Sequence, residues 1–196
     1  MKQCVLATNN PGKLKEMNEL LVDFDYQAIP QSEFSIVEVA ETGLTFVENA
    51  IIKARHGCRE TGLPAIADDS GIAVDVLNGA PGIFSARYSG ENASDEANLA
   101  KLLQNTADVD KPTARYHCVI VFMQHEDDPT PIICHGTWEG YLLKESVGDG
   151  GFGYDPIFFV PEENCTAAQL SAERKNQLSH RGQALRQLAE MLKQLI

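Results

Sequence analysis

Two adjacent carboxylates after a short apolar segment are the strongest candidates for catalysis. Ala65–Ala67 is predicted to be a strand that ends at Asp68 and Asp69 and enters a turn at Gly71. Successive side chains of a strand point to opposite faces, so only one of the two acids can serve a given site. An acid at the end of a buried strand suits a metal ligand or a general base. Alternatively, both acids cap the following turn.

A second acidic segment, from Glu38 to Glu41, lies directly before Gly43. Mg²⁺ is usually held by one or two protein carboxylates, and water and substrate phosphate oxygens complete its coordination. Asp69 with Glu41 would form such a site. The second carboxylate stays open among Glu38, Glu41 and Asp68.

The first helix is predicted to begin with a cation. Asn10 is the expected N-cap and Pro11 the first helical residue, which puts Lys13 in the first turn. A helix N-terminus carries roughly +0.5 charge, so a lysine there is unfavourable unless an anion is shared. Asn9, Asn10 and Gly12 tolerate left-handed backbone, which would let N–H groups converge on a phosphate. The alternative is an ordinary turn with a solvated lysine.

The last helix shows the same anomaly. Ser179 is its expected N-cap, His180 and Arg181 fall in its first turn, and Lys175 lies shortly before it. These cations oppose the helix dipole unless they face electronegative atoms of a ligand. A solvated surface is the usual meaning of such a pair, but the repetition in an acidic chain favours a ligand.

The densest glycine segment, Gly148–Pro156, carries two aromatic residues, Phe152 and Tyr154, and then Asp155. Ordering several glycines is entropically costly. We therefore favour close backbone approach to a flat ligand stacked on one of the aromatic rings over an elaborate turn.

Apolar periodicity predicts the elements that position these residues. Helices are expected over Pro11–Leu21, from Thr45 onward and from about His180 to the end of the chain. Thr45 and Glu48 form a capping-box pattern. Strands are expected at Cys4–Thr8, Ala65–Ala67, Ile72–Val76, Arg115–Gln124, Ile132–Thr137 and Ile157–Val160. The alternation predicts an α/β fold, a long mixed central sheet flanked by helices, in a single domain over residues 1–196.

The helix from Thr45 carries a polar stripe opposite its apolar face. Thr45, Asn49, Lys53 and His56 follow helical spacing and could line a cleft. A solvated polar face is the commoner meaning of such a stripe.

Composition limits the classes of partner. A net charge of −12 and an acidic pI near 4.8 argue against binding nucleic-acid polymers. Apolar runs such as Cys118–Met123 have strand length, so we expect no membrane span or signal peptide and a soluble, cytoplasmic protein. The five cysteines include no C-x-x-C pair and are expected to be reduced, buried thiols. A zinc site of Cys118 and Cys134 with nearby histidines is disfavoured.

Six segments resemble, in order and spacing, the inosine triphosphate pyrophosphatase family. They are ATNNPGK at 7–13, AETGLTFVENAIIKAR at 40–55, AIADDSG at 65–71, GAPGIFSARYSG at 79–90, GGFGYDPIFF at 150–159 and SHRGQAL at 179–185. The resemblance covers essentially the whole chain. It implies a Mg²⁺-dependent homodimer that hydrolyses ITP, dITP and XTP to the monophosphate and pyrophosphate, which removes deaminated purines from the nucleotide pool.

The resemblance also implies roles for individual residues. Asp69 would be the proton acceptor, and Glu41 and Asp69 would hold the metal. The implied substrate-binding residues are Thr8, Asn9, Asn10, Pro11, Gly12, Lys13, Lys53, Ser70, Phe152, Gly153, Tyr154, Asp155, Lys175, His180 and Arg181. Donors aimed at the 6-oxo group of the base would reject adenine, whose amino group cannot accept them.

Two other functions fit parts of the pattern. A purine nucleotide sensor without catalysis would need the phosphate and base contacts but no metal ligand or base, so the acids disfavour it. A phosphatase that acts on monophosphates would release orthophosphate, so the identity of the product separates it from a pyrophosphatase.

Overall fold

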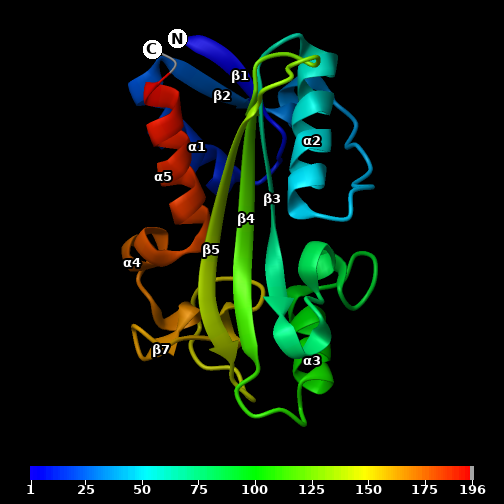
Figure 1. Ribbon diagram of the computed structural model, residues 1–196, viewed down its shortest axis with the longest axis vertical. Helices are drawn as coiled ribbons and strands as arrows, with labels where there is room; N and C mark the ends of the chain where they lie inside the picture. The colour runs from blue at the N-terminus through cyan, green and yellow to red at the C-terminus, as the bar shows by residue number, and fades with distance from the viewer. Residues whose placement is uncertain (195–196) are drawn as a thin grey trace. The chain divides into compact units, whose positions relative to one another are not determined.

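The computed structural model describes residues 1–194, and the chain forms two compact units (Figure 1). The first unit comprises Met1–Asp69, Cys118–His135 and Gln183–Ile196, and the second comprises Ser70–His117 and Gly136–Gly182. The chain therefore passes from one unit to the other four times. The expectation of a single domain over residues 1–196 stays a prediction.

Seven strands form one mixed sheet, in the order β2-β1-β3-β4-β5-β6-β7. The strand β1 pairs in parallel with β2 and β3, whereas β6 pairs antiparallel with β5 and β7. The strands are β1 (Lys2–Leu6), β2 (Tyr26–Pro30), β3 (Ala65–Val74), β4 (Thr113–Met123), β5 (Ile132–Leu142), β6 (Phe158–Val160) and β7 (Cys165–Thr166). The predicted mixed sheet of an α/β fold is confirmed.

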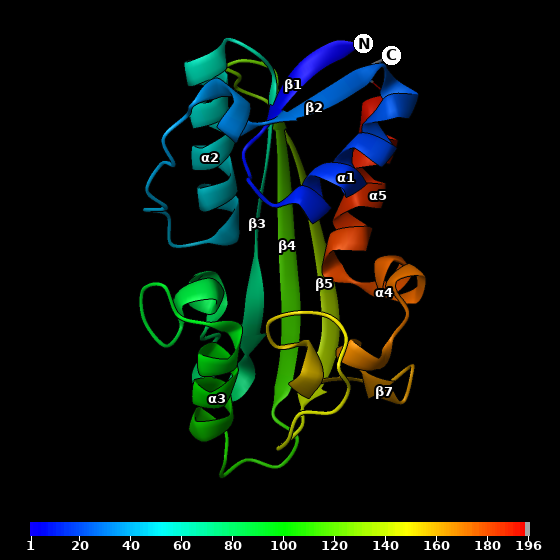
Figure 2. The ribbon, with the colours of Figure 1, turned by 180° about the vertical axis from the view of Figure 1, so that it is seen from behind.

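Residues 1–194 contain five α-helices: α1 (Pro11–Leu21), α2 (Phe46–Thr61), α3 (Asp95–Asn105), α4 (Ala172–Leu178) and α5 (His180–Lys193). Within the first unit, Figures 1 and 2 show α1 and α5 on one side of the strands and α2 on the other. The expected helix starts at Pro11, Thr45 and Ser179 are confirmed to within a residue. The expected continuation of α5 through residues 195–196 lies outside the described part of the chain.

Two strand predictions are wrong in an informative way. The expected strands Ala65–Ala67 and Ile72–Val76 are one continuous strand, β3, so Asp68 and Asp69 lie inside it rather than before a turn. Buried carboxylates normally end a strand, but each of these has a lysine partner and can stay in the sheet. The short strands β2 and β7 were not predicted, because neither shows a clear apolar alternation.

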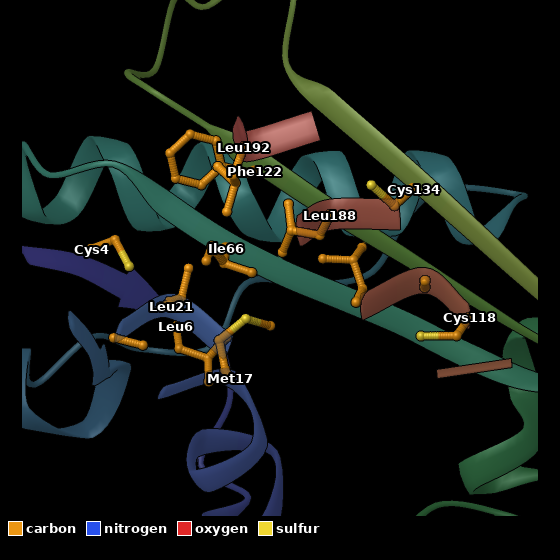
Figure 3. Close-up of a cluster of buried hydrophobic side chains, with 13 residues drawn as sticks. Cys4, Leu6, Met17, Leu21, Ile66, Cys118, Phe122, Cys134, Leu188 and Leu192 are labelled. Carbon is orange, nitrogen blue, oxygen red and sulfur yellow. The ribbon is translucent and has the colours of Figure 1, made fainter. Parts of the chain in front are cut away.

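The core of the first unit has two layers, one on each face of the strands. On one face, Leu6 and Ile66 pack with α1 and α5, as Figure 3 shows for Met17, Leu21 and Leu188. The other face packs against α2 through small residues and a cysteine: Val5, Ala50, Ala54, Cys58, Ala65 and Ala67. The alternation along β3 therefore presents Ile66 to one layer and its two alanine neighbours to the other.

The second unit has its own aromatic core. Tyr116, Trp138 and Phe158 pack together, with ring centroids 4.8 to 6.4 Å apart. The aliphatic residues Ile72, Leu102, Leu142 and Ile157 complete this core.

All five cysteines are free, and four of them are buried. Burial raises the pKa of the Cys4 thiol to about 12 and that of Cys134 to about 11. No group of three or more His, Cys, Asp or Glu side chains within residues 1–194 is arranged to hold a metal ion. In the same range, no helix is long and apolar enough to span a membrane.

The predicted cap of α2 is confirmed. Thr45 Oγ1 accepts the N–H of Glu48 at 3.2 Å and donates to Glu48 Oε2 at 2.9 Å. The glutamate also accepts the N–H of Leu44 at 2.9 Å, one residue before the position of a standard capping box.

Thr45→Ala should lower the free energy of unfolding by about 1 kcal/mol, the usual cost of removing an N-cap side chain. Urea unfolding followed by circular dichroism measures the change. Thr130→Ala, at an exposed position that caps no helix, is the control and should stay within about 0.5 kcal/mol of the wild type. Equal effects of the two substitutions would contradict the importance of this cap.

Candidate active site

A lysine and two carboxylates form a largely buried cluster in the first unit. Lys53 Nζ donates to Glu41 Oε1 at 2.8 Å and to Asp69 Oδ1 at 3.1 Å. The side chains of Lys53 and Asp69 are only 17% and 10% exposed. The Lys53 side chain, on the polar stripe of α2, therefore binds the two carboxylates of the cluster and is largely shielded from solvent. The structure brings together the three residues that the sequence linked to metal and phosphate chemistry.

The environment sets the protonation of this cluster. Burial raises the pKa of the Asp69 carboxyl, and the charge and hydrogen bond of Lys53 offset that effect only in part. Burial alone would lower the pKa of the Lys53 ammonium, but the attraction of Asp69 and Glu41 outweighs it and the net shift is upward. Asp69 is therefore a stronger proton acceptor than an ordinary aspartate, beside a lysine that stays charged.

The other acid of the pair has a lysine of its own. Lys13 Nζ donates to Asp68 Oδ2 at 2.8 Å and to Oδ1 at 3.1 Å, and the Asp68 side chain is 4% exposed. The first turn of α1 contains no acidic residue. The anion expected near Lys13 is therefore, in this structure, a carboxylate of the chain itself, and contact of Lys13 with a phosphate stays a prediction.

The turn before α1 is closed by a side chain. Asn10 Oδ1 accepts the N–H groups of Gly12 at 2.9 Å and of Lys13 at 3.2 Å, and the Asn10 N–H donates to Thr8 Oγ1 at 3.3 Å. Neither Asn9, Asn10 nor Gly12 is among the described residues with left-handed backbone. Two N–H groups of this turn therefore converge on the Asn10 side chain, and they do so without left-handed backbone.

The donor set of the cluster fits a hard divalent cation. Glu41 and Asp69 already direct one oxygen each at the same positive charge, the ammonium of Lys53. Mg²⁺ prefers carboxylate oxygens and needs only one or two from the protein. Glu38, an alternative ligand from the sequence, instead accepts a hydrogen bond from Asn9 Nδ2 at 3.2 Å.

In the second unit, a buried carboxylate organises the glycine-rich loop. Asp155 is 2% exposed, and its Oδ2 accepts the N–H of Phe152 at 2.8 Å and pairs with Lys175 Nζ. Its Oδ1 accepts the hydroxyl of Tyr116 at 3.4 Å. Asp155 is therefore engaged with the protein on both oxygens and holds the loop in place.

The two aromatic residues of this loop differ in exposure. Phe152 is 71% exposed, and the ammonium of Lys175 lies 4.6 Å from the centre of its ring. Tyr154 is 5% exposed, and its hydroxyl donates to the carbonyl of Ser85 at 2.8 Å. Tyr154 packs in the core of the second unit. Of the two rings, we therefore expect Phe152 to be the one that stacks on a flat ligand.

Several glycines of this loop have a structural explanation. Gly148 and Gly151 have φ values of +90° and +75°, which other residues rarely adopt. A Cβ at Gly150 would lie 2.6 Å from the carbonyl oxygen of Ala168. An elaborate turn therefore accounts for these three glycines, and contact with a ligand stays a prediction for the loop.

His180 begins α5 beside the aromatic core. Its ring stacks on Tyr116 with centroids 4.7 Å apart and an angle of 7° between the planes, and the ring of Trp138 lies 6.4 Å away. Ser179 Oγ accepts the N–H of Gly182 at 3.2 Å, which confirms the expected cap. The stacking fixes the plane of the imidazole ring. A residue that recognises a flat base needs a ring with a fixed orientation.

The other expected contacts lie in the same unit. Ser70 is half-buried on β3, and Arg181 is half-buried in the first turn of α5. The N–H of Gly153 donates to Asp95 Oδ2 at 2.8 Å. Contact of these three residues with a nucleotide stays a prediction.

Sequence reasoning missed some residues that support the site. Tyr116 contacts both Asp155 and His180, and its position inside a strand gave no local signal of this role. Asn49 contacts Asp69, and its place one turn before Lys53 on the polar stripe was the available signal.

Without metal, Asp69→Asn should leave the free energy of unfolding at neutral pH unchanged or raise it. A carboxyl whose pKa is raised on folding contributes stability below its unfolded pKa and loses it as pH rises through the folded pKa. The variant has no such loss, so its advantage should grow as the pH rises from about 4 toward neutral. Urea unfolding in chelator across this range measures the difference. A wild type whose advantage grows with pH would contradict the assignment.

Comparisons with known proteins agree with the geometry. The model of the Ham1 family matches residues 4–191. The chain is 63% identical to a dITP/XTP pyrophosphatase of Vibrio vulnificus, with 99% of this chain and 98% of the relative covered. It is 59% identical to a protein of the same name from Photobacterium profundum, with 98% and 99% covered.

A solved structure shares the fold. The HAM1 protein of Coxiella burnetii has a TM-score of 0.95 and 54% identity, and the match covers 99% of this chain and all of that one. The resemblance drawn from the six motifs is thus confirmed. A family match over residues 4–191, with relatives and a fold this similar, shows that the chain belongs to the Ham1 family.

Proposed function

We propose that this chain hydrolyses non-canonical purine nucleoside triphosphates, such as ITP, dITP and XTP, to the monophosphate and pyrophosphate. The observation that carries the proposal is the buried cluster of Asp69, Lys53 and Glu41, which combines a proton acceptor, a cation and a second carboxylate. The names of the relatives, dITP/XTP pyrophosphatase, support the substrate and the product.

Charge neutralisation is the main requirement for attack of water on a phosphoanhydride. Lys53 and Lys13 supply two positive charges from separate helices of the first unit. An ammonium has three N–H donors, and Lys53 directs two of them to carboxylates, so it can also donate to a phosphate oxygen. The helix start at Asn10 adds a partial positive charge.

Asp69 is the candidate proton acceptor for the attacking water. Lys53 keeps one of its carboxylate oxygens oriented. Glu41 and Asp69 would hold Mg²⁺, which, when bound, supplies further neutralisation of phosphate charge. The fit of two carboxylates that already share one cation supports this assignment.

The second unit supplies candidate contacts for the base. The exposed ring of Phe152 offers a stacking surface, and Lys175 lies against it. His180 and Arg181 are donors that could meet a 6-oxo group. Adenine would leave such donors unpaired, which is a strong basis for rejection.

A homodimer and a cytoplasmic location belong to the same proposal. Both rest on the resemblance of the chain to its family.

A product assay tests the proposed function. The purified chain is incubated with Mg²⁺ and ITP, XTP, GTP or ATP, and the products are separated by ion-exchange chromatography. We expect monophosphate and pyrophosphate from ITP and XTP, with ATP slower by about 100-fold or more. Orthophosphate as the product would indicate a phosphatase, and nucleotide binding without turnover would indicate a sensor.

Asp69→Asn should lower kcat by about 10²- to 10⁴-fold, the range expected for loss of a general base. Asp75→Asn is the matched control, because Asp75 is exposed and pairs with Arg115 in the second unit. It should retain the wild-type kcat. Full activity of Asp69→Asn would exclude the assigned role.

A further inference from the structure

Asn49 is the most deeply buried polar residue that touches the active-site cluster. It lies on α2, one turn before Lys53, and has no exposed surface. Its Nδ2 donates to Asp69 Oδ2 at 3.4 Å, and its Oδ1 accepts the N–H of Gly43 at 2.9 Å. A buried amide is kept only where both of its ends have partners, and these two partners lie on different segments.

These contacts close a ring of interactions through the cluster. Lys53 binds Glu41 and one oxygen of Asp69, while Asn49 binds Gly43 and the other oxygen of the same carboxylate. Glu41 and Gly43 are two residues apart on one loop. Lys53 and Asn49, one turn apart on α2, therefore each connect that loop to Asp69 on β3. The carboxylate of Asp69 is thereby held at both oxygens.

Gly43 shows how closely the loop approaches this amide. A Cβ on Gly43 would lie 2.7 Å from Asn49 Oδ1 and 2.5 Å from Glu48 Cβ. Real Cβ atoms do not approach other atoms so closely. The loop that carries Glu41 therefore has a glycine where it meets the amide of Asn49, and this close packing fixes the distance between the loop and the helix.

We propose that Asn49 is a positioning residue for the reaction: it sets the orientation of the Asp69 carboxylate and the register of the Glu41 loop against it. The inference rests on the proposed function, because Asp69 and Glu41 act in that reaction. A group that orients a catalytic or metal-binding carboxylate typically contributes about 10- to 100-fold to activity. Substitution of Asn49 should therefore affect the chemical step more than binding of the nucleotide.

Two substitutions separate positioning from simple support of the fold. Asn49→Ala removes both hydrogen bonds. Asn49→Asp keeps an oxygen that can accept the N–H of Gly43 but removes the donor to Asp69. Because the new carboxylate would also repel Asp69, a loss of kcat in Asn49→Asp supports positioning only if Asn49→Ala, which adds no charge, loses kcat as well, whereas loop support alone predicts that Asn49→Ala loses stability and keeps its kcat.

Asn18→Ala is the matched control in the same unit. The Asn18 amide also bridges, since it accepts the N–H of Ala28 at 2.8 Å and donates to the carbonyl of the same residue at 3.1 Å. Asn18 lies on α1, and its partner Ala28 lies on β2. Asn18→Ala should lower stability without changing kcat.

The experiment measures kcat and KM for ITP with Mg²⁺, together with urea unfolding, for the wild type and the three variants. We expect both Asn49 variants to lose about 10- to 100-fold in kcat with KM changed by less than about threefold, and Asn18→Ala to keep its kcat. If Asn49→Ala does not fold, Asn49→Ser, which also removes the amide without adding a charge, takes its place. A kcat of Asn49→Asp within twofold of the wild type would overturn the inference. A wild type without pyrophosphate release would instead reject the proposed function.

Discussion

The ammonium of Lys53 forms ion pairs with carboxylate oxygens of both Glu41 and Asp69. The fold of the first unit depends on this pairing of buried charges. A carboxylate inside a sheet is costly unless it is paired and hydrogen-bonded. The strand β3 carries two of them in succession, and each has its own lysine from a different helix. The pairing lets the strand continue without interruption from Ala65 to Val74.

The two lysines come from opposite sides of the strands because the side chains of β3 alternate. Asp68 follows the face of Ile66, where α1 packs, and meets Lys13. Asp69 follows the face of Ala65 and Ala67, where α2 packs, and meets Lys53. The separation of the two core layers and the separation of the two lysine–aspartate pairs thus have one cause, the alternation of side chains along β3.

This alternation was predictable from the sequence, and so were the caps at Asn10, Thr45 and Ser179. All of these depend on residues within four positions of one another. The continuity of β3 was not predictable, because it depends on lysines 16 and 55 residues away. A local pattern of two acids after three apolar residues resembles a strand end, and only the distant partners make it a strand interior.

The glycine-rich loop shows the same limit in the second unit. The density of glycines favoured contact with a ligand over an elaborate turn, whereas the positive φ values at Gly148 and Gly151 belong to such a turn. Which aromatic ring would stay exposed was not predictable, since Tyr154 turns inward to reach the carbonyl of Ser85 while Phe152 does not. The buried Asp155 then fixes the loop from within.

Glu41 and Asp69 are the proposed cation site of a nucleotide pyrophosphatase, and the position of a bound ion tests that proposal. Anomalous diffraction from crystals soaked in Mn²⁺, which takes the same oxygen ligands as Mg²⁺, locates the ion directly. We expect an anomalous peak within bonding distance of carboxylate oxygens of both residues. A fully occupied ion bonded to neither carboxylate would contradict it.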